Sequence, residues 1–378
     1  MIYLPDPLRY FTAEEIERAR RYHRPARRVG LASAFLSLVV VVLLAFTGAG
    51  TGLFDDLPRW AFALSYTGLV VLAGALVRFP FSLWRGHVHE RRWGFATRGF
   101  RSWLFDWVKA LGLSMVLTSV TLLALVELAA WLPHAWPAVT APAAAALAIV
   151  LSFLGPVLFE PLFNRFHPLE DSNLEEELRA LADRARVPVR HVLVSDASRR
   201  TRKENAYVSG LARTRRVVVY DTLMRRGSTR EVRLVVAHEL GHWRAKHVLR
   251  STAIAAVGAA IGVLVLALLL SFHPLLHAIH ASGPSDPRIA PFVLLVGAAG
   301  GLITQPFGVA LSRRWERAAD RASMELTGDG AGFAEMERNL ALVNLAELDP
   351  SRLVYLFFYT HPAPAERIAA AEVAERPD

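Results

Sequence analysis

Runs of about 20 apolar residues recur along this arginine-rich sequence. A run of this length crosses the hydrocarbon core of a bilayer as an α-helix, because each helical residue advances about 1.5 Å. The hydrophobic fraction of 53% and the mean hydropathy of +0.30 agree with membrane insertion. We predict a mainly α, polytopic membrane helical bundle with six spans at residues 29–50, 60–79, 109–132, 138–160, 251–272 and 289–311.

Basic residues alternate between the two sides of these spans. Arginine is abundant in 1–28, 80–108, 161–250 and 312–378, and almost absent from 51–59, 133–137 and 273–288. Because cytoplasmic loops carry the excess of Lys and Arg, both termini and the segment 161–250 are expected in the cytoplasm. The polar start is not typical of a signal peptide. The Arg- and Ala-rich composition favours a bacterial plasma membrane.

The net charge of +9 raises the question of nucleic acid as a partner. The charges flank the apolar runs and follow the topology rule, so we expect a lipid bilayer and no nucleic acid. The chain has no cysteine, so any zinc site must use His and carboxylate ligands.

Two acidic residues fall inside or at the end of predicted spans, Glu127 and Glu160. A carboxylate within a bilayer is costly, so each faces protein or a water-filled space, or lies at the interface. If Glu127 faces a polar channel, the chain could be a membrane transporter rather than an enzyme.

The predicted organisation has five parts. They are a cytoplasmic segment (1–28), four spans with a basic loop at 80–108 (29–160), an α+β cytoplasmic domain (161–250), two further spans (251–311) and a cytoplasmic C-terminal part (312–378). Within 161–250 we expect an amphipathic helix at 174–186 capped by Asn173, strands at 191–195 and 217–220, and a helix at 229–250. The C-terminal part is expected to be helical, with a break at 361–364.

The segment His238-Glu239-Leu240-Gly241-His242 carries the chemistry. Two histidines four apart on a helix project from one face and can bind one Zn²⁺ ion. Glu239 can then accept a proton from the attacking water, so the pattern predicts a zinc endopeptidase with one zinc per chain. A catalytic zinc needs a third protein ligand, and Glu316 is the candidate, with Asp320 one turn further along. The spacing fits an ordinary charged helix equally well.

These motifs resemble the type I CAAX prenyl endopeptidase family of membrane gluzincins. The resemblance rests on His238-Glu-Leu-Gly-His-Trp, on Glu316 with Asp320, and on Thr360-His361-Pro362 followed by Glu366-Arg367. It implies a ring of helices enclosing a chamber, with Glu316 as the third zinc ligand and Asp320 as its structural neighbour. It further implies that His361 and Arg367 bind the substrate and the developing oxyanion. Without the resemblance, His361 could simply cap a helix that the prolines end.

Two further features stay open. Asn205, Ala206 and Tyr207 precede a predicted strand and form either an exposed edge that binds extended substrate or an ordinary hairpin. His247 lies off the ligand face and is expected to be a pocket or packing residue rather than a ligand. Four spans precede the zinc helix, fewer than in the eukaryotic enzymes, which leaves prenylation of the substrate open. The alternative within the protease class is a quality-control enzyme related to the heat-shock membrane proteases, acting on misfolded membrane protein.

Overall fold

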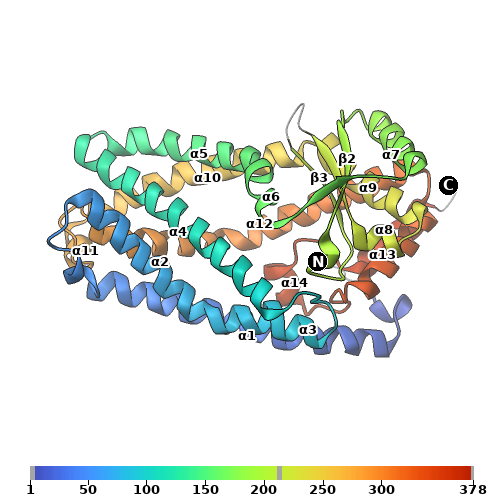
Figure 1. The fold of residues 1–378 in the computed structure, drawn as a ribbon, viewed down its shortest axis with the longest axis horizontal. Coiled ribbons are helices and arrows are strands. Elements are labelled where there is room, and N and C mark those ends of the chain that lie inside the picture. The colour runs from blue at the N-terminus through green and yellow to red at the C-terminus, as the bar shows by residue number, and fades with distance from the viewer. Residues whose placement is uncertain (1–4, 211–214, 376–378) are drawn as a thin grey trace.

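The computed structural model describes residues 5–210 and 215–375, and it divides into a ring of long helices and a protease domain at one end (Figure 1). Within these residues, six helices are long and apolar enough to cross a membrane. They are α1 (Ala13–Thr47), α2 (Arg59–Leu83), α4 (Phe100–Trp131), α5 (Trp136–Leu158), α10 (His247–Leu270) and α12 (Ala290–Thr327). Each predicted span overlaps one of them.

The six helices form a closed ring of neighbours. In order, α1 packs against α2, α2 against α4, α4 against α5, α5 against α10, α10 against α12, and α12 against α1. Large apolar side chains such as Phe35, Leu264 and Phe307 remain exposed on these helices. Such a surface is stable only in an apolar medium, so the ring belongs in a bilayer.

Several membrane helices extend past the bilayer. A helix of 35 residues is about 52 Å long, well above the roughly 30 Å of the hydrocarbon core. The polar segment before Val29 is therefore the first half of α1, which a capping box of Thr12 and Glu15 begins. Its residues Phe11 and Ile16 pack with Ile368 of the protease domain.

Most of the basic segment 80–108 is also helical. After α2, a π-helical turn (Trp84–His89) and α3 (Glu90–Arg92) follow, and α4 begins at Phe100. The predicted span at 109–132 started nine residues late, because the polar first turns of α4 do not resemble a membrane segment. Short 3-10 turns occupy Pro7–Arg9, Thr51–Leu53, Ala197–Arg199 and Pro287–Ile289.

Both acidic residues of the predicted spans lie at helix ends and are paired. Glu127 accepts from Arg59 Nη2 at 2.8 Å, four residues before α4 ends. Glu160 begins α6 (Glu160–Phe163) and pairs with Arg216 Nη2 at 2.9 Å. Neither position is that of an isolated charge inside a channel, so the observation that favoured a transporter is removed.

The protease domain contains a four-stranded sheet in the order β1-β2-β4-β3. The strands are β1 (Phe166–Pro168), β2 (His191–Ser195), β3 (Ala206–Ser209) and β4 (Arg216–Tyr220). β2 and β4 are parallel, and the two outer strands are antiparallel to their neighbours. Both predicted strands are present, and β3 occupies the segment expected to be an edge or a hairpin.

Helices cover this sheet and enclose one apolar core. They are α7 (Ser172–Arg184), α8 (Asp221–Arg226), α9 (Thr229–Arg244), α13 (Gly330–Val343) and α15 (Pro364–Ala374), with residues of α12. The cap of α7 is Asp171, whose side chain accepts from the amides of Asn173 and Leu174, so the predicted Asn173 cap was wrong. Asp171 lies two residues before Asn173, and its carboxylate forms the capping bonds.

The predicted helix 229–250 is two helices. α9 ends at Arg244, and α10 begins at His247 after Lys246, whose φ of 56° is left-handed. A left-handed residue stops the helical hydrogen-bond ladder and changes the direction of the chain. In the C-terminal part, α14 (Arg352–Phe358) ends before the expected break and α15 begins at Pro364. The short helix α11 (His273–Ala278) joins α10 to the last span.

Candidate active site and metal centre

The helix that carries the His-Glu-Leu-Gly-His segment packs directly against α12. Ser228 and Glu231 form a capping box that begins α9. Gly241 allows the close approach, because a Cβ atom there would lie 2.8 Å from Ala322 Cβ and 3.1 Å from the Ala319 carbonyl oxygen. This approach brings the middle of α12 to the two histidines.

Three side chains converge from these two helices. The Nε2 atoms of His238 and His242 lie 3.2 Å apart. Glu316 places Oε2 at 3.3 Å from His238 Nε2 and Oε1 at 3.3 Å from His242 Nε2. One ligand atom from each residue lies within 4.8 Å of the others, a group that could hold a metal ion. Glu316 Oε2 is buried without a hydrogen-bond donor among the described residues, which is costly unless a cation meets it.

The second nitrogen of each histidine is also bound. His238 Nδ1 lies 2.9 Å from Asp320 Oδ1. His242 Nδ1 lies 3.0 Å from His247 Nδ1, and the His247 ring stacks on Trp315 with 13° between the planes. If each ligand histidine donates its Nδ1–H, its Nε2 lone pair points at the metal position. His247 is thus a packing residue, as expected, but one that also orients His242.

Glu239 is partly buried beside this group. Burial raises the pKa of the Glu239 carboxyl, and the neighbouring imidazoles of His238 and His242 oppose the increase. A carboxylate whose pKa is raised towards neutrality can both accept and return a proton. This is the property that a general base in peptide hydrolysis requires.

Arg367 lies behind the histidines and is held by two carboxylates. Its Nε donates to Asp320 Oδ2 at 3.0 Å and its Nη1 lies 2.7 Å from Glu337 Oε2. Its Nη2 approaches His238 Nδ1 at 3.3 Å. The guanidinium of Arg367 is therefore bound by both carboxylates. Through Asp320, this network of three side chains holds the Nδ1 side of the His238 ring in place.

His361 lies on the open side of the group. Its Nε2 is 3.4 Å from Glu316 Oε2, while its side chain is 58% exposed. His361, Arg367 and Asn205 all line one cavity of about 1050 Å³, which continues between α1, α12 and α14. A substrate in this cavity would reach His361 from the membrane side.

Asn205, Ala206 and Tyr207 lie at the sheet edge beside this cavity. β3 is the last strand of the sheet, and the Val208 carbonyl on its outer side accepts from Trp243 Nε1 at 3.1 Å. The Asn205 carbonyl accepts from the Tyr220 amide at 2.9 Å, so backbone groups of Ala206 point the other way. The Tyr207 hydroxyl contacts Glu160 Oε2 at 3.3 Å. The Ala206 amide is already met by Asn205 Oδ1 at 2.9 Å, so an extended peptide would have to meet the remaining main-chain groups on the outer side of β3.

Comparison with known families agrees with this geometry. Residues 168–375, more than half of the chain, match the sequence profile of peptidase family M48. The chain belongs to peptidase family M48. Residues 2–165 match a profile described as the CAAX prenyl protease N-terminal region with five membrane helices. Within the described residues of this M48 peptidase, four candidate spans precede α9, one fewer than that description.

Several individual proteins are similar along most of their length. An uncharacterized metalloprotease of Bacillus subtilis, YhfN, is 28% identical over 98% of this chain and 88% of its own. CAAX prenyl protease 1 of Saccharomyces cerevisiae is 28% identical over 82% of this chain and 72% of its own. The crystal structure of Ste24p from S. mikatae superposes with a TM-score of 0.82 at 25% identity, covering 98% of this chain and 91% of that one. This M48 peptidase is therefore a membrane-embedded metalloendopeptidase similar to the CAAX prenyl proteases.

One residue of the site was missed by the sequence analysis of this M48 peptidase. Glu337 is buried on α13, between Phe333 and Ala341 on the same buried face. An acidic residue four positions from two core residues is a usable signal for a buried charge pair. Recognising Arg367 as its partner would have required the tertiary structure, because α13 and α15 are separated by α14.

Proposed function

We propose that this M48 peptidase is a zinc endopeptidase that binds one zinc ion per chain through His238, His242 and Glu316. The observation that carries the proposal is the convergence of these three ligand atoms beside Glu239. Two imidazoles and a carboxylate suit Zn²⁺, and a cation would satisfy the buried Glu316 Oε2, which has no hydrogen bond among the described residues. Zinc at this position supplies a Lewis acid that polarises the scissile carbonyl and makes water a nucleophile near neutral pH.

The chain's own residues would perform the remaining steps. Glu239 accepts the proton of the attacking water and returns it to the leaving amine. His361 stands on the open side of Glu316, where its imidazole can donate to the oxygen that gains negative charge. Arg367 acts mainly as a positioning residue, because Asp320 and Glu337 already occupy its guanidinium. The backbone of β3 aligns the substrate as an added strand.

The cavity supports a substrate that has an apolar part. Its polar end carries His361 and Arg367, and its far end is lined by Leu31, Leu302 and Phe357 from the membrane helices and α14. A peptide whose cleavage site is followed or preceded by a lipid or an apolar segment would fit both ends. We therefore favour a lipidated, CAAX-like C-terminal peptide over an unfolded membrane protein, in keeping with the name of the Saccharomyces cerevisiae relative.

The placement in the cell is proposed from charge. The basic segments lie at the end of the ring that carries the protease domain, so that end would face the cytoplasm. A bacterial plasma membrane fits the likeness to the Bacillus subtilis protein. Accessibility of single cysteines introduced at residues 20 and 134 to an impermeant thiol reagent tests this orientation, since the chain has no native cysteine.

The deciding experiment compares three substrates. Detergent-purified protein is offered a farnesylated CAAX peptide, the same peptide without the lipid, and an unfolded membrane-protein fragment. Preferential cleavage of the lipidated peptide is expected. Cleavage of only the other two would retain the zinc chemistry and replace the CAAX-like role with membrane-protein quality control.

The control variants separate chemistry from metal binding. Glu239→Gln should keep its zinc, measured by elemental analysis, and lose at least about 100-fold in turnover because the general base is absent. Glu325→Gln, on the exposed side of α12, should be as active as the wild type. Proteolysis retained by Glu239→Gln would contradict the role given to Glu239.

A further inference from the structure

A second pocket lies where the membrane helices meet the protease domain, away from the metal centre. It has a volume of about 730 Å³. Its lining contains five cationic side chains, Arg184, Arg186, Arg215, Arg244 and Lys246. The residues that line it include no aspartate or glutamate. We call it the junction pocket.

Most of its cations have no ion-pair partner in the part of the chain that the structure describes. Among the described residues, no acidic group forms an ion pair with Arg184, Arg186 or Lys246, and Arg244 reaches Glu325 only at 3.7 Å with both side chains exposed. Elsewhere on this chain, arginines such as Arg216 and Arg230 have carboxylate partners within 3 Å. Like charges gathered without partners repel one another, so an anionic ligand would stabilise the folded protein.

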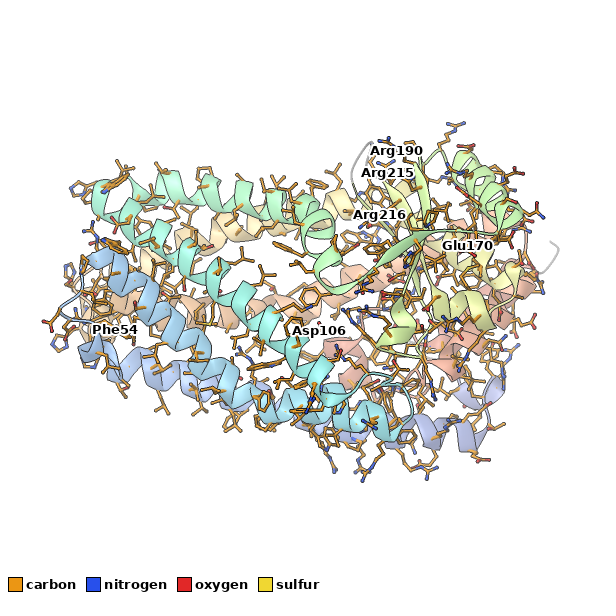
Figure 2. The ribbon with its side chains drawn as sticks, viewed as in Figure 1. Phe54, Asp106, Glu170, Arg190, Arg215 and Arg216 are labelled. Carbon is orange, nitrogen blue, oxygen red and sulfur yellow. The ribbon has the colours of Figure 1, made fainter. Side chains whose placement is uncertain are left out.

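Arg215 forms one wall of this pocket with a donor left over. Its guanidinium stacks over the Trp243 ring at 4.5 Å, and Nη1 donates to the Pro188 carbonyl at 3.4 Å. Its Nε is buried and has no hydrogen-bond partner among the described residues. Figure 2 shows Arg215 beside Arg190, whose amide donates to the Arg215 carbonyl at 3.0 Å. A guanidinium that lies over an indole ring and lacks an acceptor at Nε is suited to bind an oxyanion.

Two of the cations occupy backbone positions that normally favour glycine. Arg186, just after α7, and Lys246, between α9 and α10, both have φ of 56°. A side chain in the left-handed region is unfavourable relative to glycine at the end of a helix. The two turns therefore hold long cationic side chains at the pocket, where glycine would leave no charge.

The remaining lining residues place the junction pocket at the bilayer surface. Val248 and Leu249 belong to the first turn of the membrane helix α10, and Phe153 belongs to the last two turns of α5. These two helices pack against each other along the ring. We propose that the junction pocket binds the phosphate headgroup of an anionic phospholipid. The headgroup lies among the cations, and the acyl chains lie along α5 and α10.

The test measures lipid binding, so it does not depend on proteolysis. Full-length protein in detergent is titrated with phosphatidylglycerol, with phosphatidylcholine of the same acyl chains, and with inorganic phosphate, and bound lipid is counted by native mass spectrometry. The wild type should bind phosphatidylglycerol in preference to phosphatidylcholine. The variant Arg184→Gln/Arg186→Gln/Lys246→Gln should bind phosphatidylglycerol at least about tenfold more weakly.

The matched control removes three exposed arginines from the first half of α1, in Arg18→Gln/Arg21→Gln/Arg24→Gln, and should bind like the wild type. Equal binding by the wild type and the junction variant would overturn the proposal, as would an equal loss in the control. If inorganic phosphate at millimolar concentration displaced bound phosphatidylglycerol as effectively as added phosphatidylglycerol does, the assignment of a lipid ligand would be overturned. If the triple variant does not fold, Arg186→Gln and Lys246→Gln are measured singly, and each should weaken binding about threefold to tenfold.

Discussion

Two sets of charged side chains, at opposite ends of the molecule, use the same chemistry in different surroundings. Arg59 and Glu127 meet where α2 begins and α4 ends, at the end of the ring far from the sheet (Figure 1). Their side chains are 43% and 24% exposed. The network of Asp320, Arg367 and Glu337 behind the metal centre is nearly inaccessible, with side-chain exposures of 5%, 13% and 6%. Burial therefore decides how much each set contributes.

The difference follows from solvent screening. Water surrounds the exposed pair and weakens its attraction, so such a pair stabilises a protein by about 0–1 kcal/mol. In the buried network, water cannot replace a missing partner, and removing one side chain leaves the others desolvated and unpaired. The exposed pair links the start of α2 to the end of α4, whereas the buried network holds His238 in place.

The largest expected effect is that of Arg367→Ala. It leaves two buried carboxylates without their shared cation and should destabilise the protein by about 3–5 kcal/mol. Thermal unfolding in detergent and bound zinc, measured together, should both fall. If the variant kept the wild-type melting temperature and zinc content, the buried network would contribute little to stability or to zinc binding.

His247→Ala should have the next largest effect, and on metal affinity rather than on folding. His247 holds the Nδ1 side of His242, and loss of such a partner weakens metal binding by about 10–100-fold. Competition with a zinc chelator of known affinity measures the change. His247→Asn can restore an acceptor at this position and should recover part of the affinity; the same deficit in both variants would point to the lost stacking on Trp315 instead.

Glu337 should make stability depend on pH. Burial raises the pKa of the Glu337 carboxyl to about 7. The Arg367 guanidinium lowers this pKa, and the negative charge of Asp320, which shares that guanidinium, raises it. The unfolded value is about 4.3, so the stability that comes from the raised pKa is fully present below that pH and is lost as pH rises through about 7. The free energy of unfolding of Glu337→Gln, relative to that of the wild type, should therefore increase from pH 5 to pH 8 in chemical unfolding. A difference that is constant with pH would mean that Glu337 is ionised throughout.

The smallest effect is expected at the exposed pair. Arg59→Gln should change the melting temperature by only a degree or two, in line with about 1 kcal/mol or less, and should leave peptide cleavage unchanged. A loss comparable to that of Arg367→Ala would break the contrast between the two ends. It would also revive a functional role for Glu127 inside the ring.

Much of the fold could be predicted from local patterns. Long apolar runs, alternating basic loops and β-branched strands act over a few residues, so six spans and strands β2 and β4 were found. Boundaries were less accurate where a helix leaves the membrane, as in α1 and α4, because polar helical turns lack the apolar signal. The turn at Lys246 was missed since nothing in Ala245-Lys246 resembles glycine or proline.

Spacing along the chain was enough to predict that the chain enters a membrane, that His238 and His242 share one helix face, and that Glu239 lies next to His238. It did not determine whether Glu316 belongs to them, since residues 74 positions apart meet only when α9 packs against α12 at Gly241. The tertiary structure also decided that Arg367 faces Asp320 and Glu337, and that five cations meet in the junction pocket. Such groupings arise from the packing of separate elements, whose energies no local pattern records.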